Sequence, residues 1–185
     1  PRPSCSVKYP NNRDDERCYI PMNKLLLDAI ERTDGQFRCS FSLSGTVIRQ
    51  LREWAPEALD TFVALAESGN VEFLCETSQH GLPSIGHFDE FADQVAIQKK
   101  TVTDLFGKPT SFRNTELIMD NAICKKVEEL GFDCMLGEGA DRWLDWRSPQ
   151  VPYRPLGCER LKLLLRSYSL SDDIAFRFSN KQWPN

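Results

Sequence analysis

The sequence predicts an α/β fold in which a parallel sheet forms an incomplete (β/α) barrel. Short apolar runs of strand length alternate with longer segments that have helical periodicity throughout the chain. Acidic residues follow two of the apolar runs, at the position where α/β enzymes carry their chemistry. An ordinary closed barrel needs about 250 residues. Five or six strands in 185 residues therefore predict an incomplete one.

The first half of the chain begins this alternation with a helix. Pro21 suits the first turn of a helix, where its missing N–H leaves no hydrogen bond unmade. Ser44 can cap a second helix, and Pro56 can open a third. We expect, in order, a helix over 21–32, a strand over 37–43, a helix from Ser44 through Leu51, a helix over 56–67 and a strand over 71–75.

The second half continues the pattern to the last predicted strand. Gly107 and Pro109 end one helix, and Gly131 ends another. A long loop over 143–159, which contains three prolines, precedes the final strand. We expect a helix over 88–106, a strand over 110–114, a helix over 119–130 and strands over 132–136 and 161–165.

Composition bounds the class of protein. A hydrophobic content of 41% in 185 residues allows one substantial core, so we expect a single domain over residues 1–185. The net charge of −4, with basic and acidic residues well mixed, argues against nucleic acid as a partner. No apolar run reaches the roughly 18 residues that span a bilayer, so no membrane association is expected.

The cysteines indicate a reducing environment. There are seven, widely spaced and without a CxxC pair, so neither a zinc site nor a redox motif is indicated. We expect reduced, mostly buried thiols and a cytoplasmic location. A processed or exported form stays open, because the first residue is not Met. No cofactor and no metal is implied.

Two strand ends carry the candidate site. Arg113 and Glu116 lie at and just after one predicted strand, and Glu72, Glu76 and His80 lie in and after another. Carboxylates on two neighbouring strand ends are typical of a sugar-cleaving site. Each residue also has a simpler interpretation: Glu116 could cap the next helix, Glu72 could lie on an exposed edge, and His80 could be an ordinary surface histidine.

Five segments carry a resemblance to a known family. Together they resemble the α-amylase-type branch of glycoside hydrolase family 57, and the similarity runs from about Cys18 to Trp183. The segments are CYIPMN at 18–23, GNVEFLCETSQH at 69–80, SFRNTEL at 111–117, EGADR at 138–142 and LSDDIAFRFS at 170–179.

The resemblance implies a fold, a reaction and roles for several residues. It implies a relative of the family's seven-stranded barrel that acts on α-1,4-glucans or maltooligosaccharides with retention of configuration. Glu116 matches the catalytic nucleophile, and Glu72 and His80 match residues that line the sugar cleft. The residues expected to bind substrate are Glu72, Glu76, His80, Arg113, Asp141 and Trp143.

The chain departs from the family pattern at three places. It has no His-Gln-Pro triplet, so we expect the first barrel strand to be missing. It also lacks the later Asp-Tyr-Glu-Thr-Phe-Gly-Glu-His motif that carries the general acid. Asp173 is therefore the expected acid, with Asp141 as the alternative. Finally, Cys75 replaces an expected glycine and Gly81 an expected serine.

Two other functions are supported by fewer features of the sequence. A truncated, catalytically silent domain that binds α-glucan or serves in an assembly would explain the missing motifs. A metal-dependent polysaccharide deacetylase has a similar barrel, but it needs an aspartate and two histidines around one metal, which His80 and His87 match poorly. Open sheet edges also favour a homo-oligomer that covers them.

Overall fold

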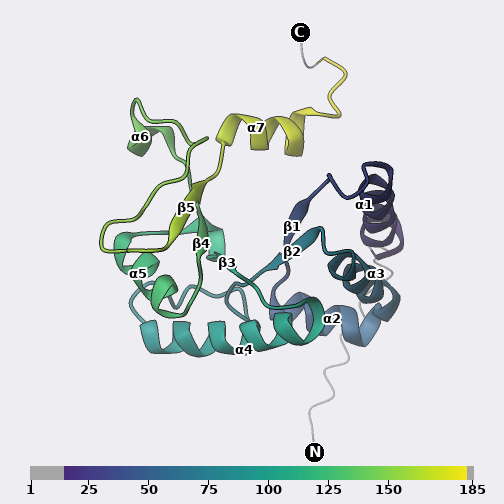
Figure 1. Ribbon diagram of the computed structural model, residues 1–185, viewed down its shortest axis with the longest axis horizontal. Helices are drawn as coiled ribbons and strands as arrows, with labels where there is room; N and C mark the ends of the chain where they lie inside the picture. The colour runs from purple at the N-terminus through teal and green to yellow at the C-terminus, as the bar shows by residue number, and fades with distance from the viewer. Residues whose placement is uncertain (1–14, 183–185) are drawn as a thin grey trace, which may run out of the picture. The chain divides into compact units, whose positions relative to one another are not determined.

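The computed structural model describes residues 15–182, which belong to two compact units (Figure 1). The first unit contains residues up to Cys39 together with 47–72. The second contains 40–46 and the chain from Phe73 onward. The expected thiol of Cys5 and the end of the family resemblance at Trp183 lie outside the described residues.

Helices make up most of the first unit. Leu26 and Ile30 of the first long helix are buried, as are Phe62 and Leu65 of the third, because each helix presents an apolar stripe to its neighbours. The elements are η1 (Asp15–Tyr19), α1 (Ile20–Arg32), α2 (Gly45–Trp54) and α3 (Pro56–Glu67), of which α2 begins within the second unit.

A partly buried hydrogen bond joins α1 to α3. Asn23 Nδ2 donates to Thr61 Oγ1 over 2.8 Å, and Asn23 is almost completely buried. Prolines lie in the first turns of both helices, as the sequence predicts.

Within the described residues, five short strands form two sheets. β1 (Cys39–Ser42) pairs with β2 (Val71–Leu74), and β3 (Ser111–Arg113), β4 (Cys134–Gly137) and β5 (Lys162–Leu165) form a three-stranded parallel sheet. Cys75, the residue after β2, adds a parallel bridge to Phe112 of β3. The α/β class with parallel strands is therefore confirmed, although the strands are shorter than expected.

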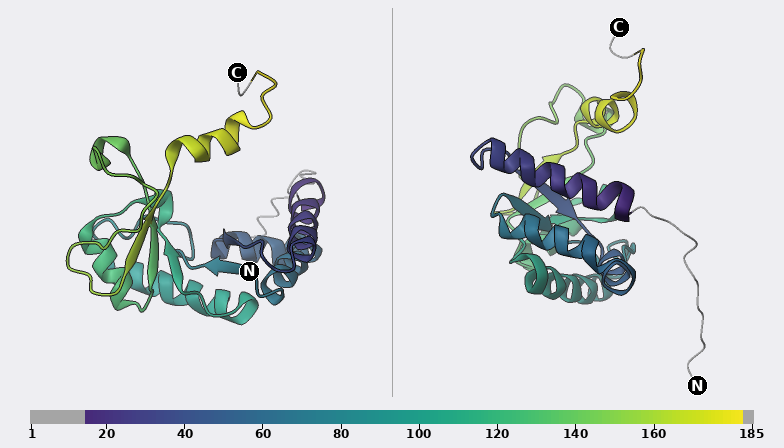
Figure 2. Two further views of the ribbon diagram at one scale, coloured as in Figure 1. Left: turned by 45° about the horizontal axis from the view of Figure 1, so that its top comes forward. Right: turned by 90° about the vertical axis from the view of Figure 1, so that its right-hand side faces the viewer.

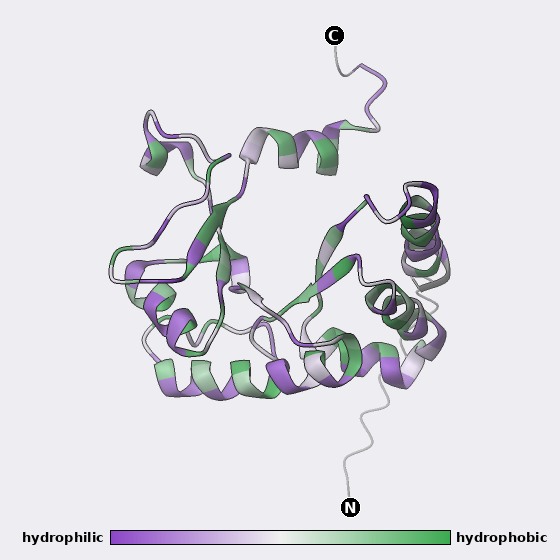
Figure 3. Ribbon diagram, viewed as in Figure 1, coloured by the Kyte–Doolittle hydropathy of each residue, from purple (hydrophilic) through white to green (hydrophobic). Residues whose placement is uncertain are grey.

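The core of the second unit lies between the three-stranded sheet and two helices, α4 (Phe88–Phe106) and α5 (Asn121–Glu129). Phe112, Met135 and Leu163 stand opposite one another in the register and form one buried row. The ring of Phe91 on α4 meets Phe112 edge-on at 5.7 Å. Figure 2 shows both helices beside the strands, and Figure 3 shows hydrophobic residues on β4 and β5.

The helix ends follow from local chemistry. Helix α4 has the bounds that the sequence predicts, and Gly107 ends it with a positive φ of 96°. Asp120 caps α5 by accepting a hydrogen bond from the backbone N–H of Ile123 at 2.7 Å. Glu116 does not cap this helix, because it lies four residues before Asp120, which does.

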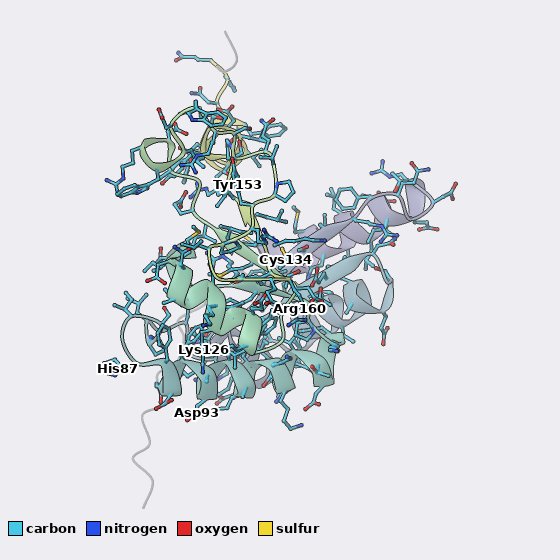
Figure 4. All side chains as sticks on the ribbon, turned by 60° about the vertical axis from the view of Figure 1, so that its left-hand side comes forward. His87, Asp93, Lys126, Cys134, Tyr153 and Arg160 are labelled. Carbon is cyan, nitrogen blue, oxygen red and sulfur yellow. The ribbon has the colours of Figure 1, made fainter. Side chains whose placement is uncertain are left out.

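Three short helical segments lie where no helical period is visible in the sequence. They are α6 (Asp141–Leu144), α7 (Tyr168–Asp172) and η3 (Asp173–Arg177). The loop after α6 also approaches the sheet, because Tyr153, labelled in Figure 4, pairs with Leu163 of β5 in an antiparallel bridge.

The six cysteines from Cys18 onward are all unpaired thiols. Cys75 and Cys124 are buried, and desolvation raises the pKa of each thiol to about 12. These two side chains therefore pack as small apolar groups, and their thiols stay protonated and are not nucleophiles. Within residues 15–182, no helix combines the length and the apolar content needed to span a membrane.

Candidate active site

The candidate site forms where two adjacent strand segments end. Beyond Cys75, which bridges to Phe112, the chain turns through Glu76 to His80. Beyond β3, it passes through Asn114 into a 3₁₀ turn, η2 (Thr115–Leu117), that contains Glu116. The ends of parallel strands lie at one edge of a sheet, so these two turns are neighbours.

Four charged or titratable side chains form a continuous series at this edge. Arg113 Nη1 lies 3.7 Å from Glu76 Oε2, and His80 Nδ1 lies 3.1 Å from the same oxygen. His80 Nε2 then lies 3.9 Å from Glu116 Oε1. The sequence predicts all four as site residues, and the fold brings them together.

The two carboxylates in the series have opposite environments. The side chain of Glu76 is only 3% exposed, while that of Glu116 is 74% exposed. A buried carboxylate is costly unless it is paired, and Arg113 and His80 provide that pairing. With its Nδ1 donating to Glu76, the His80 ring directs Nε2 toward Glu116. Glu76 therefore orients the group that meets the exposed carboxylate.

The backbone is strained at both turns. His80 and Glu116 each have a φ of 53°, and Leu117 has a φ of 56°. Residues with side chains rarely adopt this left-handed region, which costs about 1–3 kcal/mol for each residue held there. Such strain concentrates at functional sites, where the surrounding structure maintains it. Here it projects the Glu116 side chain outward from the end of the strand.

Buried hydrogen bonds tie the two turns together. Thr77 Oγ1 lies 3.2 Å from Thr115 Oγ1, and Asn114 Nδ2 donates to Ser84 Oγ at 2.9 Å. The backbone N–H of His80 also donates a hydrogen bond to the backbone carbonyl of Thr77, at 3.1 Å. These residues could not be singled out from the sequence, because short polar side chains in loops are common. Their only signal was position, directly beside the two predicted strand-end acids.

The other predicted residues lie on separate elements. Glu72 is half-buried in β2, on the opposite strand face from Val71 and Phe73. Asp141 is the exposed first residue of α6, and Trp143 on the same helix is also exposed. The Arg142 guanidinium lies 5.3 Å from the Trp143 ring centre.

Asp173 is part of a local ion pair. Its Oδ1 accepts a hydrogen bond from Arg177 Nη1 at 2.6 Å, one turn along η3. Its neighbour Asp172 instead pairs with Arg166, the residue after β5, at 3.0 Å. Arg166 also approaches Glu138, the residue after β4, at 3.9 Å. Further charged side chains thus follow the ends of the next two strands.

The histidines and acids do not assemble a metal centre within residues 15–182. The second histidine, His87, is exposed at the residue before α4, and Figure 4 shows it at the periphery. The arrangement is suited to organic acid-base or nucleophilic chemistry by side chains.

A sequence model of glycosyl hydrolase family 57 matches residues 4–185 of this chain. The chain belongs to glycosyl hydrolase family 57. This finding agrees with the five motifs that carry the resemblance. The family 57 chain is also 41% identical, over 174 residues, to a protein of Methanocaldococcus jannaschii described as "Putative alpha-amylase". The match covers 93% of this chain and 36% of that protein, so the chain spans about a third of its relative's length.

Solved structures show the same fold. The 4-alpha-glucanotransferase from Thermococcus litoralis is similar with a TM-score of 0.74 and 18% identity, over 86% of this chain and 25% of that one. A family 57 branching enzyme from Thermococcus kodakaraensis is similar with a TM-score of 0.70 and 14% identity, over 87% and 43% of the two chains. The family 57 barrel relationship is therefore confirmed for a partial barrel.

Proposed function

We propose that this chain carries the nucleophile side of a retaining glycoside hydrolase that acts on α-1,4-glucans. Family membership supports a glycoside hydrolase acting on glucans. The single observation that carries the finer proposal is the exposed Glu116 carboxylate, held at a strand end in a left-handed turn with His80 Nε2 3.9 Å away.

In this mechanism Glu116 attacks the anomeric carbon of the glucan and forms a covalent glycosyl ester while the glycosidic oxygen departs. An acid on the opposite face protonates that oxygen. Water then attacks the ester, and the same acid, now a base, takes the proton from the water. We propose Asp173 for this second group, with Asp141 as the alternative.

The remaining residues act on the substrate. His80, with Glu76 behind it, is suited to hydrogen-bond a sugar hydroxyl beside the nucleophile. Arg113, 3.7 Å from Glu76, extends the polar wall. The exposed ring of Trp143 offers a flat apolar face on which a sugar ring can stack. The substrate class we propose is a soluble α-glucan or maltooligosaccharide.

Replacing Glu116 with glutamine tests the nucleophile. Glu116→Gln keeps the shape of the side chain and removes the attacking oxygen's charge, so turnover of a maltooligosaccharide should fall by several orders of magnitude. Steady-state kinetics of the full-length protein measures this. Glu129→Gln, an exposed residue at the end of α5, is the matched control and should keep full activity.

Asp173→Asn provides the second arm of the experiment. If Asp173 is the acid, this variant should lose activity on maltooligosaccharides but keep much of its kcat/KM on an aryl α-glucoside, whose leaving group needs no protonation in the first step. Its kcat on the aryl substrate should fall, because the same residue is the base that activates water in the second step. Normal turnover by Glu116→Gln would overturn the proposed nucleophile. A parent protein that binds α-glucan without cleaving it would instead indicate a silent binding or assembly domain.

A further inference from the structure

Asn114 occupies an unusual position between the two turns of the site. It follows β3 directly, lies two residues before Glu116 and is completely buried. Its Nδ2 donates to Ser84 Oγ and to the backbone carbonyl of Ile118, both at 2.9 Å. Ser84 is itself buried in the segment between His80 and α4. One amide group therefore connects the far end of the Glu116 turn to the segment that carries His80.

The same side chain also has a buried oxygen atom, Asn114 Oδ1, that accepts no hydrogen bond from the described residues. Burying a carbonyl oxygen without a partner lowers stability, because the oxygen gives up its hydrogen bonds to water. An asparagine here is therefore not the best choice for stability. The two donated hydrogen bonds are what the side chain contributes.

Those bonds act on the strained part of the backbone. Asn114 and Ile118 bracket the left-handed residues Glu116 and Leu117, and the Leu117 N–H donates to the Asn114 carbonyl at 3.0 Å. Asn114 thus holds the turn with two hydrogen bonds. Its backbone carbonyl accepts one from Leu117, and its side-chain amide donates the other to the carbonyl of Ile118. Without the side-chain bond to Ile118, the left-handed conformation loses one of the contacts that maintain it.

We propose that Asn114 is a positioning residue that fixes the Glu116 carboxylate relative to His80. The inference rests on the proposed function, in which Glu116 is the nucleophile. A nucleophile must stand about 3–3.5 Å from the carbon that it attacks, and a displacement of about 1 Å can reduce turnover by roughly a hundredfold. Asn114 therefore affects the rate of attack and contributes little to substrate affinity.

A second contact shares this task. The Thr77–Thr115 hydroxyl contact joins the same two turns at their near ends. Loss of the Ser84 contact alone should consequently displace the turn less than loss of the whole Asn114 amide.

Replacement of Asn114 in the full-length protein tests the proposal. In Asn114→Ala, kcat for a maltooligosaccharide should fall by roughly 10- to 100-fold, while KM should change by no more than about threefold. Asn23→Ala is the matched control, because Asn23 is equally buried and its amide also donates to a hydroxyl, that of Thr61. The control should lose a similar amount of thermal stability and keep its kcat.

Ser84→Ala gives a milder variant that removes one donated bond and retains the other. It should fold, and its kcat should lie between those of the parent protein and Asn114→Ala. The inference is overturned if a folded Asn114→Ala, or Ser84→Ala where Asn114→Ala does not fold, has the kcat of the parent. It is equally overturned if Asn23→Ala loses kcat to the same extent. Loss of activity in Glu116→Gln alongside normal kcat in these variants would reject the positioning role and leave the proposed nucleophile intact.

Discussion

His80 connects a buried carboxylate to an exposed one. Its Nδ1 contacts Glu76, and its Nε2 faces Glu116 at a distance slightly longer than a hydrogen bond. A sugar hydroxyl that lies between His80 and Glu116 could contact both. The proposed role of His80 is therefore to bind and align the substrate rather than to exchange protons with it.

Substitution of His80 should affect the reaction more than the fold. Loss of one hydrogen bond to a substrate hydroxyl costs about 0.5–1.5 kcal/mol, so His80→Ala should reduce kcat/KM by roughly two- to tenfold. His87→Ala, at an exposed site before α4, should leave kcat/KM unchanged. Unaltered catalysis by His80→Ala together with a melting temperature lowered by several degrees would indicate a structural role.

The sequence indicated which residues of the candidate site lie at strand ends, but not the environment of each side chain. Arg113, Glu76, His80 and Glu116 were all predicted, because each lies at or just after a strand. Neither the burial of Glu76 nor its contact with Arg113 could be predicted, because both depend on packing between segments distant in the chain. Asn114 was missed for the same reason.

At the level of elements, strong local signals predicted the bounds of helices. The predicted bounds of α3 and α4 are those observed, because Pro56 opens one helix and Gly107 ends the other. The strands are shorter than predicted, because pairing partners limit them and a single chain segment does not reveal its partners. Helices α6 and α7 are too short to show an apolar period.

Glu128, near the end of α5, organises the approach to β5. Its Oε1 accepts hydrogen bonds from the backbone N–H groups of Arg160 at 2.6 Å and Leu161 at 2.7 Å, and Glu159 N donates to the same carboxylate at 3.1 Å. These bonds, with that of Leu161 foremost, lower the pKa of Glu128 below its ordinary 4.5. A helix side chain therefore holds the start of a strand.

This contact should make stability depend on pH. A lowered pKa in the folded protein means that Glu128 stabilises the fold above about pH 4.5, and that this contribution is lost as pH falls through the folded-state pKa. Glu128→Gln should therefore unfold at a lower urea concentration than the parent at pH 7. The difference between the two should shrink as the pH falls below 4.5.

Glu129→Gln is the control for the urea experiment, because Glu129 makes a solvent-exposed contact with Lys126 at 3.8 Å. Exposed ion pairs contribute little to stability, so this variant should unfold with the parent at both pH values. A constant difference between Glu128→Gln and the parent across the pH range would show that the carboxylate charge is not responsible.

The whole molecule presents large apolar side chains to solvent. In the second unit they include Trp146 just after α6, Leu156 in the loop before β5, and Phe176 and Phe178 at the end of η3, each at least three-quarters exposed. Exposed apolar groups of this size are typical of surfaces that become covered. Water contact with these groups is unfavourable, and association would relieve it.

A protein of this 185-residue sequence should therefore self-associate in solution. Size-exclusion chromatography with light scattering should give a mass above that of one chain, which is 21.2 kDa. The double variant Trp146→Ser, Phe176→Ser should shift the mass toward a single chain. A monomeric parent at high micromolar concentration would contradict this expectation.

The loop bridge at Tyr153 determines what form such association can take. Strands that polymerise into fibres need a row of vacant N–H and C=O groups as a template. On the outer edge of β5, Leu163 already exchanges both bonds with Tyr153, and the Leu161 N–H is taken by Glu128. Within residues 15–182, Leu165 is the next outward-facing position and cannot template a fibre alone. Strand pairing through this edge of β5 is therefore disfavoured, and association of the second unit should instead use the exposed aromatic side chains.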